Sequence, residues 1–406
     1  RPPRSTLFPY TTLFRSRSTA DSTTATQHSR CCALAAEGEL SRACAALTEP
    51  APLPPSQATF EQLSAHHPQS AMPDVSRLGP ARPAAVPELS SEAVIGALKT
   101  FPRASAPGPS GLRADHIKET LATAHGDEVT AHLVSLCQLL AKGEAPTVVA
   151  PYLGGARLHA LPKKNGGVRP IAVGETIRRL VGKVLCHATR ADSNQYFWPL
   201  QVGVGVKLGG EAAVHTARQW AERNAGTADK VLLKVDFQNA FNSVDRFALL
   251  SETRAAFPGL ACWVDWCYSS ASVLRFGKHT IPSTRGIQQG DPLGPLLFSA
   301  ALQPALRKTA QCPVELCFSY LDDAVLAGRA DAVAAAFRVL QHEAAVAGLQ
   351  LEPSKCELVP LAPQADLSAF PPSFQVRRPG VFDLLGSPVG DFDHCNTFTQ
   401  TERVRS

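Results

Sequence analysis

Three aspartates stand where carboxylates could act together. Two of them, Asp322 and Asp323, are adjacent, and apolar residues flank the pair on both sides. The alternation of Leu316, Phe318 and Tyr320 before the pair predicts a β-hairpin with the two aspartates at its turn. The alternative is an ordinary type I turn, in which Asp is common. Strands this apolar would instead hold the turn against a sheet, where two like charges call for a cation.

Asp236 supplies the third carboxylate. The five residues before it, 231–235, read Val-Leu-Leu-Lys-Val and predict a strand that ends at this aspartate. Carboxylates, water and substrate phosphates are the ligands that Mg²⁺ prefers. Two such ions about 3.5–4 Å apart can hold the attacking and leaving oxygens of a phosphoryl transfer. The three aspartates therefore predict a site for two Mg²⁺ ions, with Mn²⁺ as a substitute.

A glycine-rich segment between these aspartates could form the floor of a substrate site. Residues 286–298 read GIQQGDPLGPLLF, and Gly286 and Gly290 allow close approach of the backbone. Asp291 is a natural N-cap, and Pro292 suits the first position of a helix. A helix that begins after glycines can approach a phosphate or a base without steric cost.

Basic residues follow in the elements that would have to position this chemistry. Residues 158–173, LHALPKKNGGVRPIAV, predict a β-hairpin that turns at 165–167 and carries Lys163, Lys164 and Arg169 near its tip.

The next segment predicts a helix. Its apolar positions, from Ile177 to Ala188, recur at helical spacing, and its opposite face carries Arg179, Lys183, His187 and Arg190. A solvated helix face is the alternative. Beside a basic hairpin tip, a nucleic-acid track is favoured, and Arg179, Lys183 and Arg190 are its predicted contacts.

Composition limits the classes of protein that fit. The 406 residues are 44% hydrophobic, carry a net charge of +5 and contain no uninterrupted apolar run of membrane-spanning length. This argues against a membrane partner. The eleven cysteines show neither a C-x-x-C pair nor zinc-ligand spacing, which favours reduced thiols in an intracellular protein.

The first 85 residues have the composition of a linker of low order, rich in Ser, Thr, Ala and Pro. Residues 1–16 resemble a translated sequencing adapter more than protein. The chain starts with Arg, and its one methionine is Met72. We therefore expect a fragment of a longer reading frame.

Taken in order, these segments resemble a known family. The patterns D-F-x-x-A-F at 236–241, Q-G-D-P-L at 289–293 and Y-L-D-D at 320–323 look like motifs A, B and C of reverse transcriptases. Viral RNA polymerases usually carry G-D-D in place of Y-x-D-D. The residues APGPSGL at 106–112 and QVGVG at 201–205 resemble stretches typical of non-LTR (LINE-like) retrotransposon polymerases. The resemblance covers roughly residues 86–390.

The resemblance implies an RNA-directed DNA polymerase that adds dNTPs to a DNA primer on an RNA template. Asp236, Asp322 and Asp323 would be its catalytic, metal-binding carboxylates. Phe241 would exclude ribonucleotides, with a buried core aromatic as the alternative. Lys163, Lys164 and Arg169 would bind the triphosphate, and Gln289 and Gly290 would line the nucleotide pocket. Lys355 would either protonate pyrophosphate or serve the structure.

The implied fold is an α/β right-hand polymerase. Fingers are expected over residues 86–230, and a palm over 231–390 with an antiparallel sheet backed by helices. Residues 391–406 would begin the connection to a thumb that is mostly missing. The competing interpretations are an RNA-dependent RNA polymerase and a catalytically dead remnant that binds nucleic acid. A group II intron polymerase is the alternative within the family.

Overall fold

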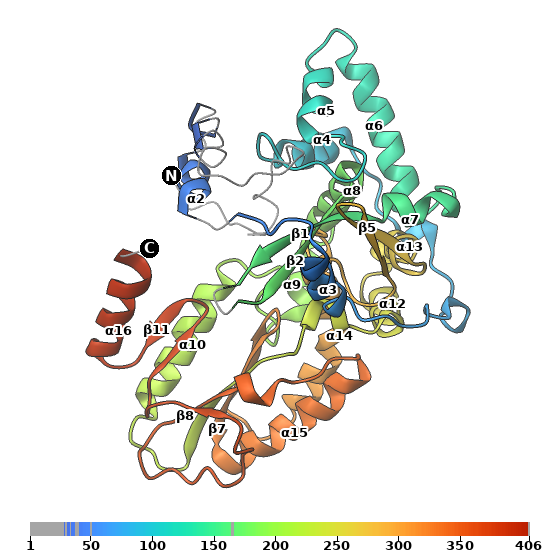
Figure 1. The fold of residues 1–406 in the computed structure, drawn as a ribbon. Helices are drawn as coiled ribbons and strands as arrows, with labels where there is room; N and C mark the ends of the chain where they lie inside the picture. Colours follow the sequence, from blue (N-terminus) through green and yellow to red (C-terminus); the bar gives the residue numbers. More distant parts are fainter. Residues whose placement is uncertain are drawn as a thin grey trace. The chain divides into compact units, whose positions relative to one another are not determined.

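The computed structural model describes residues 28, 31–32, 34–36, 40–48, 51–163 and 166–404 (Figure 1). The expected sequence artefact at residues 1–16 and the predicted site residue Lys164 lie outside the described residues. The chain divides into two compact units. The described residues of unit 1 fall within Arg190–Glu252 and Pro295–Ser406, and those of unit 2 within Thr6–Thr189 and Thr253–Gly294.

Unit 1 is built on a five-stranded sheet. Its strands lie in the order β6 (Leu316–Tyr320), β7 (Asp323–Arg329), β3 (Lys230–Val235), β8 (Glu357–Pro360) and β9 (Gln375–Val376). The strands β6, β7, β3 and β8 pair with one another in antiparallel fashion, and β9 at the edge runs parallel to β8. The predicted antiparallel sheet and the predicted hairpin are therefore confirmed.

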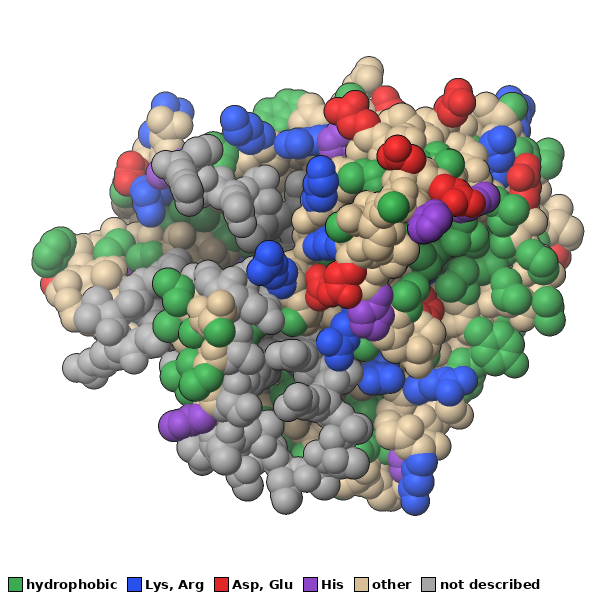
Figure 2. All heavy atoms as spheres, turned by 90° about the horizontal axis from the view of Figure 1, so that it is seen from above, with side chains coloured by type: hydrophobic (Ala, Val, Ile, Leu, Met, Phe, Trp, Pro, Cys, Tyr) green, Lys and Arg blue, Asp and Glu red, His purple; other side chains and the backbone are tan. Residues whose placement is uncertain are grey.

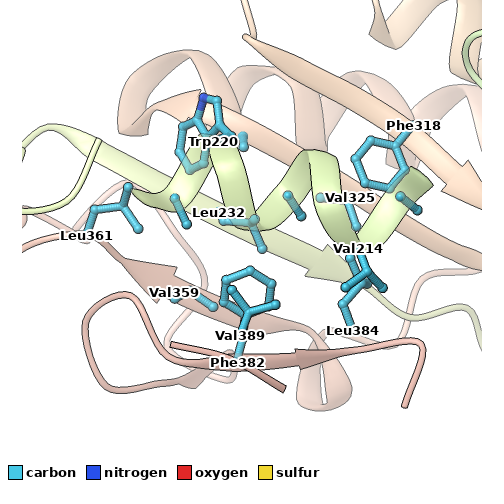
Figure 3. Packing of buried hydrophobic residues seen from close by; sticks show 14 of the residues in the cluster. Val214, Trp220, Leu232, Phe318, Val325, Val359, Leu361, Phe382, Leu384 and Val389 are labelled. Atoms are coloured by element: carbon cyan, nitrogen blue, oxygen red, sulfur yellow. The ribbon is translucent and has the colours of Figure 1, made fainter. Parts of the chain in front are cut away.

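Both faces of this sheet are covered. On one face, side chains from α10 (Gly209–Arg223) pack with Leu232, Phe318 and Val325 of the sheet and with the hairpin β10 (Phe382–Leu384) and β11 (Ser387–Val389) (Figure 3). Side chains alternate between the faces of a strand, so buried Leu233 belongs to the other face. The predicted helix there is α15 (Ala330–Val346), which packs against β7 and β3.

The remaining helices of unit 1 flank the sheet or connect its strands. They are α9 (Arg190–Phe197), α11 (Ala240–Ser243), most of α14 (Gly294–Thr309), η4 (Pro353–Lys355), α16 (Phe392–Phe398) and η5 (Thr399–Val404). The helix α12 (Arg246–Ala256) begins in unit 1 and ends in unit 2.

Unit 2 contains a four-stranded sheet in the order β2 (Val168–Gly174), β1 (Ala156–Pro162), β4 (Ser272–Phe276) and β5 (His279–Ser283). The strands β1 and β2 form the predicted antiparallel hairpin, which the hydrogen bond from Lys163 N to Gly167 O closes at 2.7 Å. The strand β4 runs parallel to β1 and antiparallel to β5.

The other elements of unit 2 are helices. They are α2 (Leu40–Thr48), α3 (Gln57–Ala65), η1 (Val75–Arg77), η2 (Pro83–Ala85), α4 (Ser91–Lys99), α5 (Ala114–Leu121), α6 (Gly126–Ala141), η3 (Thr147–Val149), α7 (Ala150–Leu153), α8 (Thr176–Ala188) and α13 (Pro258–Tyr268). None of the helices in the described ranges is long and apolar enough to cross a membrane.

Two expectations about the organisation of the chain need correction. Residues 51–85 were expected to have low order, but α3 lies there, and its Leu63 is fully buried against the unit 2 sheet. Leu53 also donates a hydrogen bond of 2.8 Å from its N–H to Ala160 O of β1. The expected boundary at residue 230 is not a unit boundary, because residues 190–230 belong to unit 1 and 253–294 to unit 2.

Candidate active site

The turn between β6 and β7 carries the acidic pair. Tyr320 pairs with Asp323 across the hairpin, so Leu321 and Asp322 alone make the turn. Asp323 is the first residue of β7 rather than a turn residue. The backbone of Leu321 is in the left-handed region, with φ of 57°, which residues other than glycine seldom adopt. Asp322 therefore sits on a tight turn with an unusual conformation at the residue before it.

The third aspartate lies at the same edge of the unit 1 sheet. Val235 of β3 pairs with Ala324 of β7, so Asp236 follows the end of one strand where Asp323 begins its neighbour. Gln350 and Glu352 hold the backbone here: Gln238 N donates to Gln350 O at 2.8 Å, and Glu352 N donates to Asp236 O at 2.9 Å. Two segments far apart in the sequence thus bring the carboxylates of motifs A and C to one edge.

The environment of Asp323 disfavours its charged form. Although much of its side chain is exposed, desolvation by the surrounding protein raises the pKa of Asp323 above its usual value. The Lys234 ammonium group lowers this pKa, and the carboxylates of Asp236 and Glu357 raise it. A partly desolvated carboxylate with other carboxylates beside it is stabilised in its charged form by a bound cation.

Cationic side chains partly balance this acidic edge. The Nζ atom of Lys355, in η4, lies 3.8 Å from Oδ1 of Asp236. Lys234 and Arg377 form ion pairs of 3.1 and 3.0 Å with Glu357. These ion pairs involve the carboxylates of Asp236 and Glu357.

The donor types at this edge suit a hard divalent cation such as Mg²⁺, because carboxylate oxygens are its preferred protein ligands. Their placement, on two adjoining strand ends and a turn, brings the three predicted ligands to one edge of the sheet. In the part of the chain that the structure describes, no three Asp, Glu, His or Cys side chains form a group that could hold a metal as they stand.

Phe241 lies close behind Asp236 in the chain, in the short helix α11. Its ring stacks on the ring of Phe298 in α14, with centroids 4.7 Å apart and planes at 19°. Phe298 is fully buried, whereas Phe241 is only half-buried. The packing thus fixes the plane of the Phe241 ring and leaves part of the side chain accessible.

Unit 2 positions the other predicted nucleotide contacts. Gln289 and Gly290 are half-buried and lie beside β2. Ala172 N of β2 donates a hydrogen bond to Gln289 O at 2.7 Å. The φ of Gly290 is 136°, and a Cβ atom there would lie 2.2 Å from Ala172 O. Only glycine fits this position, which agrees with the predicted close approach of the backbone.

A buried network of polar side chains holds the next residue, Asp291. Its Oδ2 accepts hydrogen bonds from Arg178 at 2.8 Å and from the Tyr268 hydroxyl at 2.6 Å, and its Oδ1 accepts from Leu293 N at 3.0 Å. Arg178 also donates to Gln288 and to Gly154 O. Asp291 thus caps the turn that precedes α14. The prediction that it is the N-cap of the helix, with Pro292 as the first helical residue, is wrong, because α14 begins at Gly294.

Sequence reasoning missed Arg178, which is 2% exposed. The helical pattern around Arg178 does not predict its burial or its partners, because Tyr268 and Asp291 lie far along the chain.

The predicted basic stripe on α8 is wrong for Arg179. That side chain is 3% exposed, donates to Ala106 O at 2.6 Å and lies over the ring of Phe101, and burial lowers its pKa to about 10. The cause is that α8 packs between α4 and α6, so that little of it faces solvent. Lys183 is half-buried, with Nζ donating to Thr100 Oγ1 at 3.0 Å, and burial lowers its pKa.

The other predicted basic contacts are exposed. Lys163 and Arg169 stand on the β1–β2 hairpin of unit 2, and Arg190 begins α9 in unit 1. On the face that Figure 2 shows, Lys and Arg side chains (blue) stand at several separate places rather than in one continuous patch. The hairpin is therefore the basic element that most closely matches its prediction.

Comparisons with known proteins agree with the order of these segments. The family model described as "Reverse transcriptase (RNA-dependent DNA polymerase)" matches residues 161–382. The "Retrotransposable element SLACS 132 kDa protein" of Trypanosoma brucei gambiense is 30% identical over 187 residues, which are 44% of this chain and 15% of that protein. The "Retrovirus-related Pol polyprotein from type-1 retrotransposable element R2" of Nasonia vitripennis is 27% identical over 143 residues, 32% of this chain and 14% of that protein.

This chain therefore corresponds to a small part of the length of each of these relatives. Among solved structures, telomerase from Candida albicans, in complex with a TWJ fragment of telomeric RNA, matches with a TM-score of 0.44 and 11% identity. That match covers 61% of this chain and 46% of the telomerase chain.

Proposed function

This chain belongs to the reverse transcriptase (RNA-dependent DNA polymerase) family, and we propose that it is the polymerase part of a non-LTR retrotransposon protein. Its reaction is the template-directed addition of deoxynucleotides to the 3′-hydroxyl of a DNA primer, with RNA as the template. The two relatives are retrotransposon proteins by name, which supports this setting. Unit 2 with its basic hairpin would supply the fingers, and unit 1 with its acidic edge the palm.

The observation that carries the proposal is the meeting of Asp236, Asp322 and Asp323 at one edge of the unit 1 sheet. These residues would hold two Mg²⁺ ions, or Mn²⁺ in their place. Bound there, the ions supply positive charge that stabilises the attacking and leaving oxygens of a phosphoryl transfer. The raised pKa of Asp323 and the neighbouring Asp236 carboxylate support an edge that favours added positive charge.

Other residues would position the nucleotide. The exposed Lys163 and Arg169, together with Lys164, which follows Lys163 in the sequence, would provide cations for a triphosphate. Gln289 and Gly290 would line the pocket, and the half-buried ring of Phe241 would exclude a ribose 2′-hydroxyl. In the reaction, the 3′-hydroxyl loses its proton to water, and its oxygen bonds to the α-phosphorus as the bond to pyrophosphate breaks. Nζ of Lys355, close to Asp236, would give its proton to the departing pyrophosphate.

Primer extension on an RNA template tests this function. The protein should incorporate dNTPs only with a divalent cation, and Asp236→Ala should abolish incorporation. Preferential use of rNTPs would instead identify an RNA-dependent RNA polymerase. Absence of metal-dependent incorporation, with retained binding of the primer–template, would identify a catalytically dead binding remnant.

A further inference from the structure

The turn that carries Asp322 needs outside support. Leu321 holds a left-handed backbone with φ of 57°, and such residues persist only where surrounding contacts favour them. The turn has only two residues, so a change in the backbone of Leu321 displaces Asp322 directly. Whatever fixes that backbone therefore fixes a predicted metal ligand.

One buried side chain contacts both polar groups of the Leu321 backbone. Oε1 of Gln201 accepts hydrogen bonds from Leu321 N at 2.8 Å and from Gly203 N at 2.9 Å. Nε2 of Gln201 donates to Leu321 O at 3.1 Å, and Ser319 Oγ donates to the same oxygen at 2.6 Å. Gln201 is 0% exposed, so these bonds do not compete with solvent.

The segment around Gln201 is itself tied to β6. Val202 N donates to Ser319 O at 2.8 Å, and Ser319 N donates to Leu200 O at 2.7 Å. A Cβ atom on Gly203 would lie 2.8 Å from Leu321 N and 3.0 Å from its Cγ. The first and third residues of the stretch QVGVG thus meet the turn, one through its amide and the other through having no side chain.

We propose that Gln201 is a positioning residue that holds the Leu321 peptide and, through it, the carboxylate of Asp322. The role needs an acceptor and a donor on one side chain that reaches both the N–H and the C=O of Leu321. Glutamine satisfies this need, asparagine is one methylene shorter, and leucine offers neither group. The inference deepens the proposed polymerase function and rests on it for its consequence in metal binding.

Hydrogen exchange of the full chain tests the positioning independently of activity. In Gln201→Leu, amides of the turn at residues 319–323 should exchange faster than in the wild type, and in Gln201→Asn they should change in the same direction. The control is Gln303→Leu. Gln303 is an equally buried glutamine of unit 1 (1% exposed) that donates from Nε2 to Tyr196 O at 3.1 Å and to Phe197 O at 3.4 Å. The Gln303→Leu variant should be less stable than the wild type, with unchanged amide hydrogen exchange at residues 319–323.

Binding of Mn²⁺ alone, measured by electron paramagnetic resonance, tests the consequence. Residues that orient metal ligands typically change affinity by 10–100-fold. We expect Gln201→Leu to weaken Mn²⁺ binding by roughly tenfold or more. Gln303→Leu should bind Mn²⁺ with the affinity of the wild type. The part of the bound-Mn²⁺ signal that is lost in Asp322→Asn identifies this site.

The outcomes separate the two proposals. Unchanged exchange at residues 319–323 in both Gln201 variants would overturn the positioning role, whatever the activity of the protein. Faster exchange with wild-type Mn²⁺ affinity would overturn the link to Asp322. A wild-type protein that fails to extend a primer, while the exchange result holds, would count against the polymerase function and not against the role of Gln201.

Discussion

The ammonium group of Lys355 lies 3.8 Å from Oδ1 of Asp236, although residues 355 and 236 stand in different segments of unit 1. Both side chains are substantially exposed, at 58% and 42%. Exposed pairs of this kind contribute about 1 kcal/mol or less to folding. The contact of Lys355 with Asp236 therefore contributes little to the stability of the fold.

Replacing Lys355 by Met should lower kcat for nucleotide addition by about a hundredfold, the usual scale for losing a general acid. The unfolding midpoint should barely change. Single-turnover rates of nucleotide addition measure the effect. Lys308→Met is the control, because Lys308 makes an exposed pair with Glu343 in the same unit. A wild-type kcat in Lys355→Met would contradict the role in protonating pyrophosphate and would indicate a structural role for this lysine.

Replacing Asp236 or Asp322 by Ala should abolish polymerisation and leave the fold intact. Each change removes a predicted metal ligand, and loss of Asp236 also removes a carboxylate that raises the pKa of Asp323. The unfolding midpoint in chelator should therefore stay the same or rise. Asp323→Ala should be less severe, and Asp331→Ala, at an exposed ion pair of the same unit, should behave as wild type. Incorporation by either of the first two variants would disprove the metal assignment.

Replacing Phe241 by Ala should allow the protein to incorporate ribonucleotides. The ring is half-buried on Phe298, and its removal would free the space that a 2′-hydroxyl needs. The quantity to measure is the ratio of kcat/KM for dNTP to that for rNTP, which should fall. Phe298→Leu controls for loosened packing, since it keeps the Phe241 ring. A loss of about 2 kcal/mol in stability with an unchanged ratio would mean that Phe241 is a core residue.

Asp323→Asn should stabilise the protein at neutral pH in the absence of divalent cations. The pKa of Asp323 is raised in the folded protein, so ionising it costs more there than in the unfolded chain. That cost is present above the folded pKa and vanishes below the unfolded value, near pH 3.9. Thermal unfolding in EDTA should therefore show a higher Tm for the variant at pH 7, and a difference that shrinks as the pH falls toward 4. A lower Tm for the variant at pH 7 would contradict the sign.

Replacing Arg178 by Met should destabilise the protein by about 3–5 kcal/mol, because it leaves the buried Asp291 carboxylate without its cation. Denaturant unfolding measures the loss. The double variant Arg178→Met with Asp291→Asn should recover part of it, since the unpaired charge is then gone. Lys183→Met on the same helix is a matched control, because that side chain is only half-buried. Equal effects of the two single variants would contradict the importance of the buried network.

Much of the candidate site was predictable from local patterns. The apolar run before Asp236 predicted β3, and the alternation before Asp322 predicted the β6–β7 hairpin, because a strand buries side chains with a period of two. The turn residues near 165–167 predicted the β1–β2 hairpin for the same local reason. These features depend on neighbours within a few positions along the chain.

The sequence by itself determined which residues could do chemistry, their order, and the strands that carry them. Only the tertiary structure decided their surroundings. The sequence pattern predicted that Arg179 is an exposed cation, but α8 packs between α4 and α6, and this packing buries Arg179. The network of Arg178 and the support of Leu321 by Gln201 also appear only in the folded chain. Burial and hydrogen bonding depend on partners far away along the chain, such as Ala106 for Arg179 and Leu321 for Gln201. The periodicity of one element carries no information about which distant element will cover it.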